Sequence, residues 1–163
     1  MTGKPNAFQR LIHQFIMLRP VTAFFANKIH LVDQLVLKLT AYKYTLSEFA
    51  GWNIIQLTTI GAKTNQPRTT PLVGLLDDEK IVLIATSFGR EHNPGWYYNL
   101  KANPLCNVLF KGTSSKIYVA RETNGEERER YLKMAVSQYA GYQKYKERAA
   151  HRHIPVMVLE PQK

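Results

Sequence analysis

Apolar residues recur every three or four positions in the first forty residues of the chain. In residues 5–18 and again in residues 22–40 they fall along one face of a helix. Pro20 lies between the two stretches, and proline ends or kinks a helix. The spacing therefore predicts two amphipathic, basic helices ahead of the rest of the chain.

From Gly51 onward the pattern is typical of β-structure. Short runs rich in Ile, Leu, Thr and Val alternate with turn-forming residues. The first two runs are joined by a turn at Lys63–Pro67, and a loop at Phe88–Asn93 follows the third. The predicted strands are residues 52–60, 68–76, 81–87, 105–111, 115–121 and 154–159.

Two further helices are predicted between these strands. Pro94 suits the first turn of a short helix that runs to about Ala102. Asn124 can cap a helix that has acidic residues in its first turn and continues to about Tyr139. Pro155 places the last strand at a sheet edge, or stands at the start of that strand.

The order of elements is helices, a three-strand meander, a helix, a hairpin, a helix and a strand. This order lacks the regular strand–helix alternation of a doubly wound sheet, so we expect an α+β fold built on a mostly antiparallel barrel. No repeat or linker divides the chain. We expect one compact domain, with residues 1–50 forming the N-terminal helices and residues 51–163 the barrel.

The charge balance favours anionic partners. The 163 residues carry a formal net charge of +10, with 45% hydrophobic residues as in a globular protein. Phosphates, carboxylate-rich cofactors, nucleic acid and acidic lipid all fit this charge. The basic residues are dispersed and form no helix-turn-helix, zinc or RNA-binding signature, so we expect no nucleic-acid partner.

Several features bear on localisation. Cys106 is the only cysteine, which excludes an internal disulfide and favours a reducing compartment. No apolar run approaches the roughly 18 residues of a membrane span, and no secretory signal is recognisable. We therefore expect a cytoplasmic protein. Its basic helices either pack on the barrel or a second subunit, or rest on the inner face of the cell membrane.

The turn Gly61–Arg68 is the first candidate site. Lys63 and Arg68 flank the hydroxyl of Thr64, and Arg can bind a carboxylate or phosphate through two parallel hydrogen bonds. An ordinary solvated hairpin turn explains the same residues. The turn is not a P-loop, because it lacks the required glycines and the Gly-Lys-Ser/Thr ending.

Two more segments can face a planar ring. Residues 85–89 end a strand with small and hydroxyl side chains, although a plain strand end has the same composition. Trp96 and Tyr97 begin the short helix and are candidates for either ligand contact or the core. Ser87 lacks the flanking glycines of a nucleophile elbow, so a hydrolase is poorly supported.

Three tyrosines are spaced three residues apart and share one side of a helix or of tight turns: Tyr139, Tyr142 and Tyr145. Phenols stack on ligands and donate hydrogen bonds, since their ordinary pKa lies near 10. An aromatic packing stripe has the same spacing. The five histidines show no metal-ligand pattern, so no metal is expected.

In their order and spacing, these segments resemble the deazaflavin-dependent nitroreductase family of the split β-barrel flavin-binding superfamily. The resemblance runs from about Leu57 to Pro161. It is carried by Leu57-Thr58-Thr59-Ile60-Gly61, Lys63-Thr64, Gln66-Pro67-Arg68, Pro71-Leu72, Ala85-Thr86-Ser87, Asn93-Pro94, Trp96-Tyr97, Asn99-Leu100-Lys101-Ala102-Asn103-Pro104, Ile154-Pro155-Val156 and Glu160-Pro161.

The resemblance implies a split barrel that binds coenzyme F420, a deazaflavin with a phosphate- and glutamate-bearing tail. Members pass hydride from the reduced ring to hydrophobic acceptors such as quinones and nitroaromatic compounds. A homodimer is a further possible assembly of this chain. FMN is the less favoured cofactor. A non-catalytic protein that binds F420 or lipid is the remaining alternative.

The resemblance also implies roles for particular residues. Lys63 and Arg68 would hold the anionic tail. The other implied cofactor contacts are Ala62, Thr64, Thr69, Thr70, Pro71, Leu72, Val73, Ala85, Thr86, Ser87, Phe88, Gly95, Trp96, Tyr97 and Asn99. The implied catalytic residues are Tyr139, Tyr142 and Tyr145, which would orient and protonate the acceptor, and Ser87 beside the ring.

The chain departs from the family pattern in the tail-binding turn. Ala62 stands where a basic residue is common and Asn65 where glycine is common, so Arg90 or Lys101 is an alternative contact for the tail. The loop at residues 88–92 is also shorter than in the nitroreductases proper.

Overall fold

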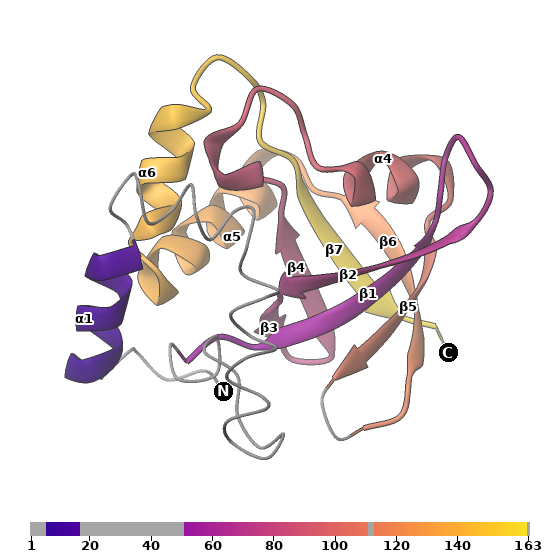
Figure 1. The fold of residues 1–163 in the computed structure, drawn as a ribbon, viewed down its shortest axis with the longest axis horizontal. Coiled ribbons are helices and arrows are strands. Elements are labelled where there is room, and N and C mark those ends of the chain that lie inside the picture. The colour runs from indigo at the N-terminus through magenta and orange to yellow at the C-terminus, as the bar shows by residue number, and fades with distance from the viewer. Residues whose placement is uncertain (1–5, 17–50, 111–112, 163) are drawn as a thin grey trace.

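The computed structural model describes residues 6–16, 51–110 and 113–162 (Figure 1). Their helices are α1 (Ala7–Ile16), α4 (Gly95–Ala102), α5 (Gly125–Gln138) and α6 (Gly141–Arg148), with a short 3-10 turn, η1 (Ser87–Gly89). Their strands are β1 (Ile54–Ile60), β2 (Pro67–Val73), β3 (Leu75–Asp77), β4 (Lys80–Ile84), β5 (Leu105–Phe110), β6 (Lys116–Glu122) and β7 (Val156–Pro161).

The strands form one curled sheet in the order β2-β1-β5-β6-β7-β4-β3, and each neighbouring pair is antiparallel. The expectation of an α+β fold with a mostly antiparallel, barrel-like sheet is therefore confirmed. The helix predicted for residues 22–40 lies outside the described residues, whereas that predicted for 5–18 corresponds to α1.

Two hydrophobic cores lie on the two faces of the sheet. Successive strand residues point to opposite faces, so β4 directs Ile81 and Leu83 into the curled side and Val82 and Ile84 to the other. Helices α5 and α6 lie beside that second face (Figure 1), where Tyr131 of α5 is fully buried. The chain between β4 and α4 runs above the end of β4 in the view of Figure 1.

The predicted strand over 68–76 is wrong, because the chain breaks at Gly74. Strand β2 pairs with β1, whereas β3 pairs with β4. The Gly74 N–H still donates to the carbonyl of Asn53 at 2.9 Å, one residue beyond the Ile54–Val73 pair, and the pairing with β4 begins at Leu75. A Cβ at this position would crowd Ile81. Glycine thus lets one run of β-forming residues pass from one part of the sheet to another.

Other details of the elements differ from the predictions. The strand predicted for 81–87 ends at Ile84, and η1 occupies part of the predicted loop. Asn124 takes the N-cap position of α5 without a side-chain hydrogen bond, and α6 was not predicted. Strand β7 lies between β6 and β4, so it is no edge strand, and Pro155 precedes its first residue.

None of the helices in the described part of the chain has the length and apolar character needed to cross a bilayer.

Candidate functional site

The β1–β2 turn is attached to α4 by one side chain. The amide oxygen of Asn99 accepts a hydrogen bond from the Ala62 N–H at 3.0 Å, and its amide nitrogen donates to the Thr59 hydroxyl at 3.0 Å. The turn itself is closed by the Gly61 N–H, which donates to the Gln66 carbonyl at 2.9 Å. These bonds give the turn a defined shape and use both ends of the Asn99 amide.

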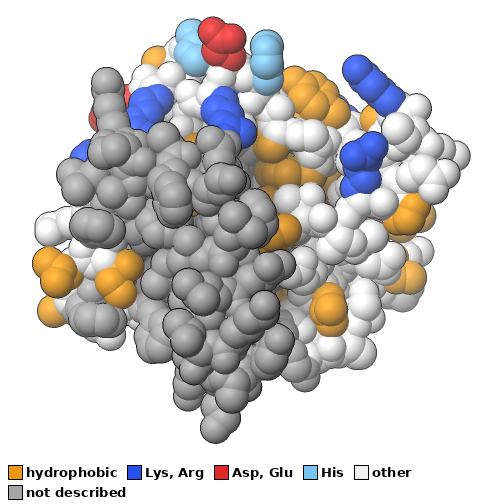
Figure 2. Space-filling view, viewed as in Figure 1, with side chains coloured by type: hydrophobic (Ala, Val, Ile, Leu, Met, Phe, Trp, Pro, Cys, Tyr) orange, Lys and Arg blue, Asp and Glu red, His pale blue; other side chains and the backbone are white. Residues whose placement is uncertain are grey.

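Lys63 and Arg68 are exposed on this turn. The Arg68 guanidinium lies 3.4 Å from the Thr64 hydroxyl, and among the described residues neither cation has a carboxylate partner. At the upper right of Figure 2, Lys and Arg side chains project from the surface. They lie beside a hollow whose floor is formed by hydrophobic side chains. The turn therefore carries positive charge that is available to an anion.

Strand β2 continues from this turn along the edge of the sheet. Among the described strands, β2 pairs with β1 alone. Such a position tolerates Pro71, because proline has no N–H to donate to a second strand. The Thr58 and Thr69 hydroxyls lie 2.8 Å apart across the pair. Most residues of β2 are exposed or half-buried, so the predicted contacts over Thr69–Val73 lie on accessible surface.

The chain after β4 adopts a backbone conformation that few residues accept. Ser87, Phe88 and Gly89 have φ values of 49°, 56° and 83°, in the left-handed region. For the two non-glycine residues this costs roughly 1 kcal/mol each. Within the described residues, no hydrogen bond is made by the amide N–H of Ser87 or of Phe88. Such strain concentrates at ligand sites, and two unused donors point to the same use.

Arg152 holds this segment in place. Its Nη2 donates to the carbonyls of Thr86 at 2.8 Å and Ala85 at 3.2 Å, and its Nε donates to the carbonyl of Arg90 at 2.9 Å. Its Nη1 also donates to the Asn93 side-chain oxygen. Partial burial lowers the pKa of Arg152. Arg152 is not among the residues predicted from the sequence, because its partners lie some sixty positions away and no spacing rule connects them.

The three predicted tyrosines converge at the junction of α5 and α6. Tyr139 has left α5 and is extended, whereas Tyr142 and Tyr145 belong to α6. The Tyr139 and Tyr145 hydroxyls lie 3.4 Å apart, and the Phe88 ring packs edge-on against Tyr145 at 5.8 Å between centroids. The tyrosines thus connect α6 with η1.

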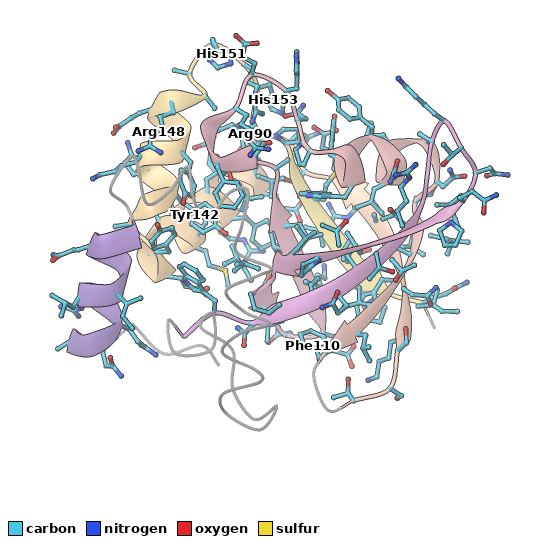
Figure 3. All side chains as sticks on the ribbon, in the orientation of Figure 1. Arg90, Phe110, Tyr142, Arg148, His151 and His153 are labelled. Atoms are coloured by element: carbon cyan, nitrogen blue, oxygen red, sulfur yellow. The ribbon has the colours of Figure 1, made fainter. Side chains whose placement is uncertain are left out.

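Burial raises the pKa of all three hydroxyls above their ordinary value of 10.0. Each phenol therefore keeps its proton at neutral pH and is able to donate a hydrogen bond. Tyr139 and Tyr145 are almost fully buried and Tyr142 is half-buried, so packing accounts for much of this cluster. Figure 3 shows Arg148 on α6 and Arg90 after η1, both above Tyr142.

Helix α4 contributes mainly packing. The Trp96 side chain is buried in the core inside the curl, and the Tyr97 hydroxyl donates to Glu122 at 3.2 Å. Glu122 also pairs with Lys101 at 3.1 Å. Burial works to raise the pKa of Glu122, but these bonds outweigh it and lower that pKa. Contacts of α4 with a cofactor remain predictions, and Lys101 is already paired.

The described residues contain no group of three or more side chains suited to a metal ion. Cys106 is buried, and its burial raises the pKa of the thiol to about 12, so this cysteine is a poor nucleophile.

Comparison with known proteins places the chain in a family. Residues 33–161 match the model of the F420H(2)-dependent quinone reductase family. An F420H(2)-dependent quinone reductase of Mycobacterium tuberculosis is 52% identical over 48 residues, which are 29% of this chain and 32% of that protein. The matched part of the chain thus spans about a third of the length of this curated relative.

Two solved structures are also similar. An F420-H2 dependent reductase, FDR-A, is 37% identical with a TM-score of 0.58, over 66% of this chain and 94% of that one. A structure described as a domain-swapped dimer is 34% identical with a TM-score of 0.61, over 78% of this chain and 92% of that one. The resemblance inferred from the motifs is confirmed, and the chain belongs to the F420H(2)-dependent quinone reductase family.

Proposed function

We propose that this protein is an oxidoreductase that transfers hydride from reduced coenzyme F420 to a quinone. One observation carries the proposal: a cationic turn with no carboxylate partner among the described residues is attached by Asn99 to α4, the helix that follows the strained 85–89 segment. A cofactor with a polyanionic tail and a planar ring needs positive charge near its tail and backbone N–H donors near its ring. Membership of the family supports the same activity.

The residues present fit the proposed cofactor. Lys63 and Arg68 would hold the phosphate and glutamates of the tail, because Arg binds such groups through two hydrogen bonds and Lys adds a compact charge. The unused N–H groups of Ser87 and Phe88 would donate to the electron-rich edge of the ring. When bound, the reduced deazaflavin supplies the hydride, and the protein supplies orientation and charge.

We propose that the tyrosine cluster serves the acceptor. The high pKa of these phenols keeps them protonated, so they can donate a hydrogen bond to a quinone oxygen on which negative charge develops. As a whole residue Tyr142 is half-buried, whereas Tyr139 and Tyr145 are buried, so Tyr142 is tested first. Replacing it by Phe should lower turnover with quinone more than it lowers F420 affinity; equal losses would indicate packing alone.

The proposal is tested by absorbance. Mixing the protein with reduced F420 and a quinone should restore the visible absorbance of the oxidised deazaflavin, at a rate proportional to protein concentration. A nitroaromatic acceptor, FMN in place of F420, and the protein without acceptor complete the panel. Binding of F420 without turnover of any acceptor would favour the non-catalytic alternative. Tight FMN binding without F420 binding would overturn the cofactor assignment.

Two finer points remain proposals. We propose a homodimer, which the similar structure described as a domain-swapped dimer supports, and sedimentation at micromolar concentration tests it. We also propose peripheral contact with acidic membranes through α1, on which Leu11 is 66% exposed. Co-sedimentation with anionic but not neutral vesicles would support this contact, and equal recovery with both would contradict it.

A further inference from the structure

Arg152 connects three stretches of residues 85–93, the segment between β4 and α4. Its guanidinium donates to the carbonyls of Ala85 and Thr86, the two residues after β4, to the carbonyl of Arg90, the residue after η1, and to the side chain of Asn93, the residue before Pro94. Building on the proposed function, we infer that Arg152 is a positioning residue for the F420 ring. It holds residues 85–93 in the shape that leaves the Ser87 and Phe88 N–H groups available.

The geometry of the peptide unit gives this role its physical basis. In a trans peptide the C=O and the following N–H point in opposite directions, and the described residues contain no cis bond. Because the Thr86 carbonyl points at Arg152 from 2.8 Å, the Ser87 N–H must point away from it. By fixing the Thr86 carbonyl, Arg152 also fixes the direction of the Ser87 N–H. It thereby opposes relaxation of the left-handed φ values at Ser87 and Phe88.

Arginine is suited to this task and lysine is not. The planar guanidinium presents five N–H donors in a fixed fork, whereas an ammonium presents three donors from one point. The fifth bond of the fork runs from Nη1 to the carbonyl of His153 at 3.1 Å. All five acceptors are uncharged oxygens, so within the described residues no carboxylate neutralises Arg152. Its positive charge lies directly behind the segment predicted to face the ring.

Helix α6 supports the segment from another direction. The Phe88 ring packs on Tyr145, and a Cβ at Gly89 would lie only 2.6 Å from the Arg148 Cβ. The segment is therefore held between Arg152 and α6, which links the donors for the ring to the tyrosines proposed for the acceptor.

The variant Arg152→Lys tests the inference, since it keeps the charge and removes the fork. Arg128→Lys is the matched control: Arg128 is also half-buried and donates to a carbonyl of the same loop, that of Ile154 at 3.1 Å, but has no bond to residues 85–93. Three measurements are made on each protein: the melting temperature, deuterium uptake over 85–93 without cofactor, and the dissociation constant for oxidised F420 by fluorescence titration.

We expect Arg152→Lys to exchange amide hydrogens over 85–93 faster than wild type and to bind F420 at least about tenfold more weakly, as small misplacements of a positioned group do. Arg128→Lys should change neither. Wild-type F420 affinity in Arg152→Lys would contradict the proposal that Arg152 positions the segment for the F420 ring. Unchanged deuterium uptake would contradict the proposal that Arg152 holds residues 85–93 in place. A melting temperature that falls equally in both variants, with equal loss of affinity, would reduce Arg152 to a structural residue.

The proposed function can be refuted separately from the structural role of Arg152. If wild-type protein binds no F420, that function is refuted and the role toward the ring falls with it. The deuterium uptake of Arg152→Lys still decides whether Arg152 holds residues 85–93.

Discussion

The two turn cations, Lys63 and Arg68, are single residues whose proposed contribution is charge and not packing. Both are exposed, and their turn is closed by backbone bonds and by Asn99. Their removal should therefore leave the fold intact. The same reasoning separates them from Trp96, whose side chain fills the core.

Replacing Lys63 and Arg68 together by Ala should weaken F420 binding roughly tenfold to hundredfold, because each charge-assisted hydrogen bond contributes about 1–1.5 kcal/mol at an exposed site. Fluorescence titration measures the change. The control replaces the exposed Lys116 and Lys133 by Ala, which lowers the net charge equally. An unchanged dissociation constant in the turn variant would contradict the assigned tail site.

Gly141 leaves room for the Tyr139 side chain. A Cβ at this position would overlap the Tyr139 ring and hydroxyl. Alanine is ordinarily better than glycine in a helix by about 1 kcal/mol, but overpacking costs about 1–3 kcal/mol. Gly141→Ala should therefore lower the melting temperature.

The matched variant for thermal melting is Gly95→Ala. Gly95 also begins an eight-residue helix, α4, and a Cβ there would meet nothing within 4 Å. Its melting temperature should stay constant or rise. A Gly141→Ala protein that melts at or above the wild-type temperature would show that Tyr139 moves aside freely.

At the scale of elements, α5 is attached to the β3–β4 hairpin through Asp77. The Tyr131 hydroxyl donates to Asp77 at 2.9 Å and Arg130 donates to it at 3.1 Å. The bond from Tyr131, helped by Arg130, lowers the pKa of Asp77 below its ordinary 3.8. A carboxyl whose pKa falls on folding stabilises the protein above its unfolded-state pKa, and this contribution is lost as the pH drops through the folded-state value.

Tyr131→Phe should therefore reduce the free energy of unfolding by about 1–2 kcal/mol at pH 7, since a hydrogen bond to a charged group is lost. The difference from wild type should shrink as the pH falls below 3.8 toward the lowered pKa of Asp77 in the folded protein. Urea unfolding at pH 7 and pH 3 measures both values. A difference independent of pH would assign the loss to packing, and Asp78→Asn controls for a charge in the adjacent turn.

At the scale of the whole molecule, the net charge of +10 should attract the anionic cofactor over a distance. Raising salt from about 0.01 to 0.15 M shortens the screening length from about 30 to about 8 Å. We expect the association rate of F420 to fall several-fold over this range while the dissociation rate changes little. Stopped-flow fluorescence measures both rates. A salt effect confined to dissociation would show that only local contacts attract the cofactor.

The sequence by itself determined most of the elements and the family. Alternation of apolar residues specified the strands, because each buries one or both faces, and Pro94 marked the start of α4. The turn at Lys63–Pro67 and the tyrosines were recognisable from residue type and spacing. These features are local, so a linear pattern records them.

The tertiary structure alone decided how separate segments meet. Gly74 divides a continuous β-forming run between two strand partners, Asn99 ties α4 to a turn some forty residues earlier, and Arg152 binds a segment some sixty residues earlier. No periodicity encodes such contacts. They depend on the register of the sheet and on the direction of individual carbonyls, which exist only once the chain has folded.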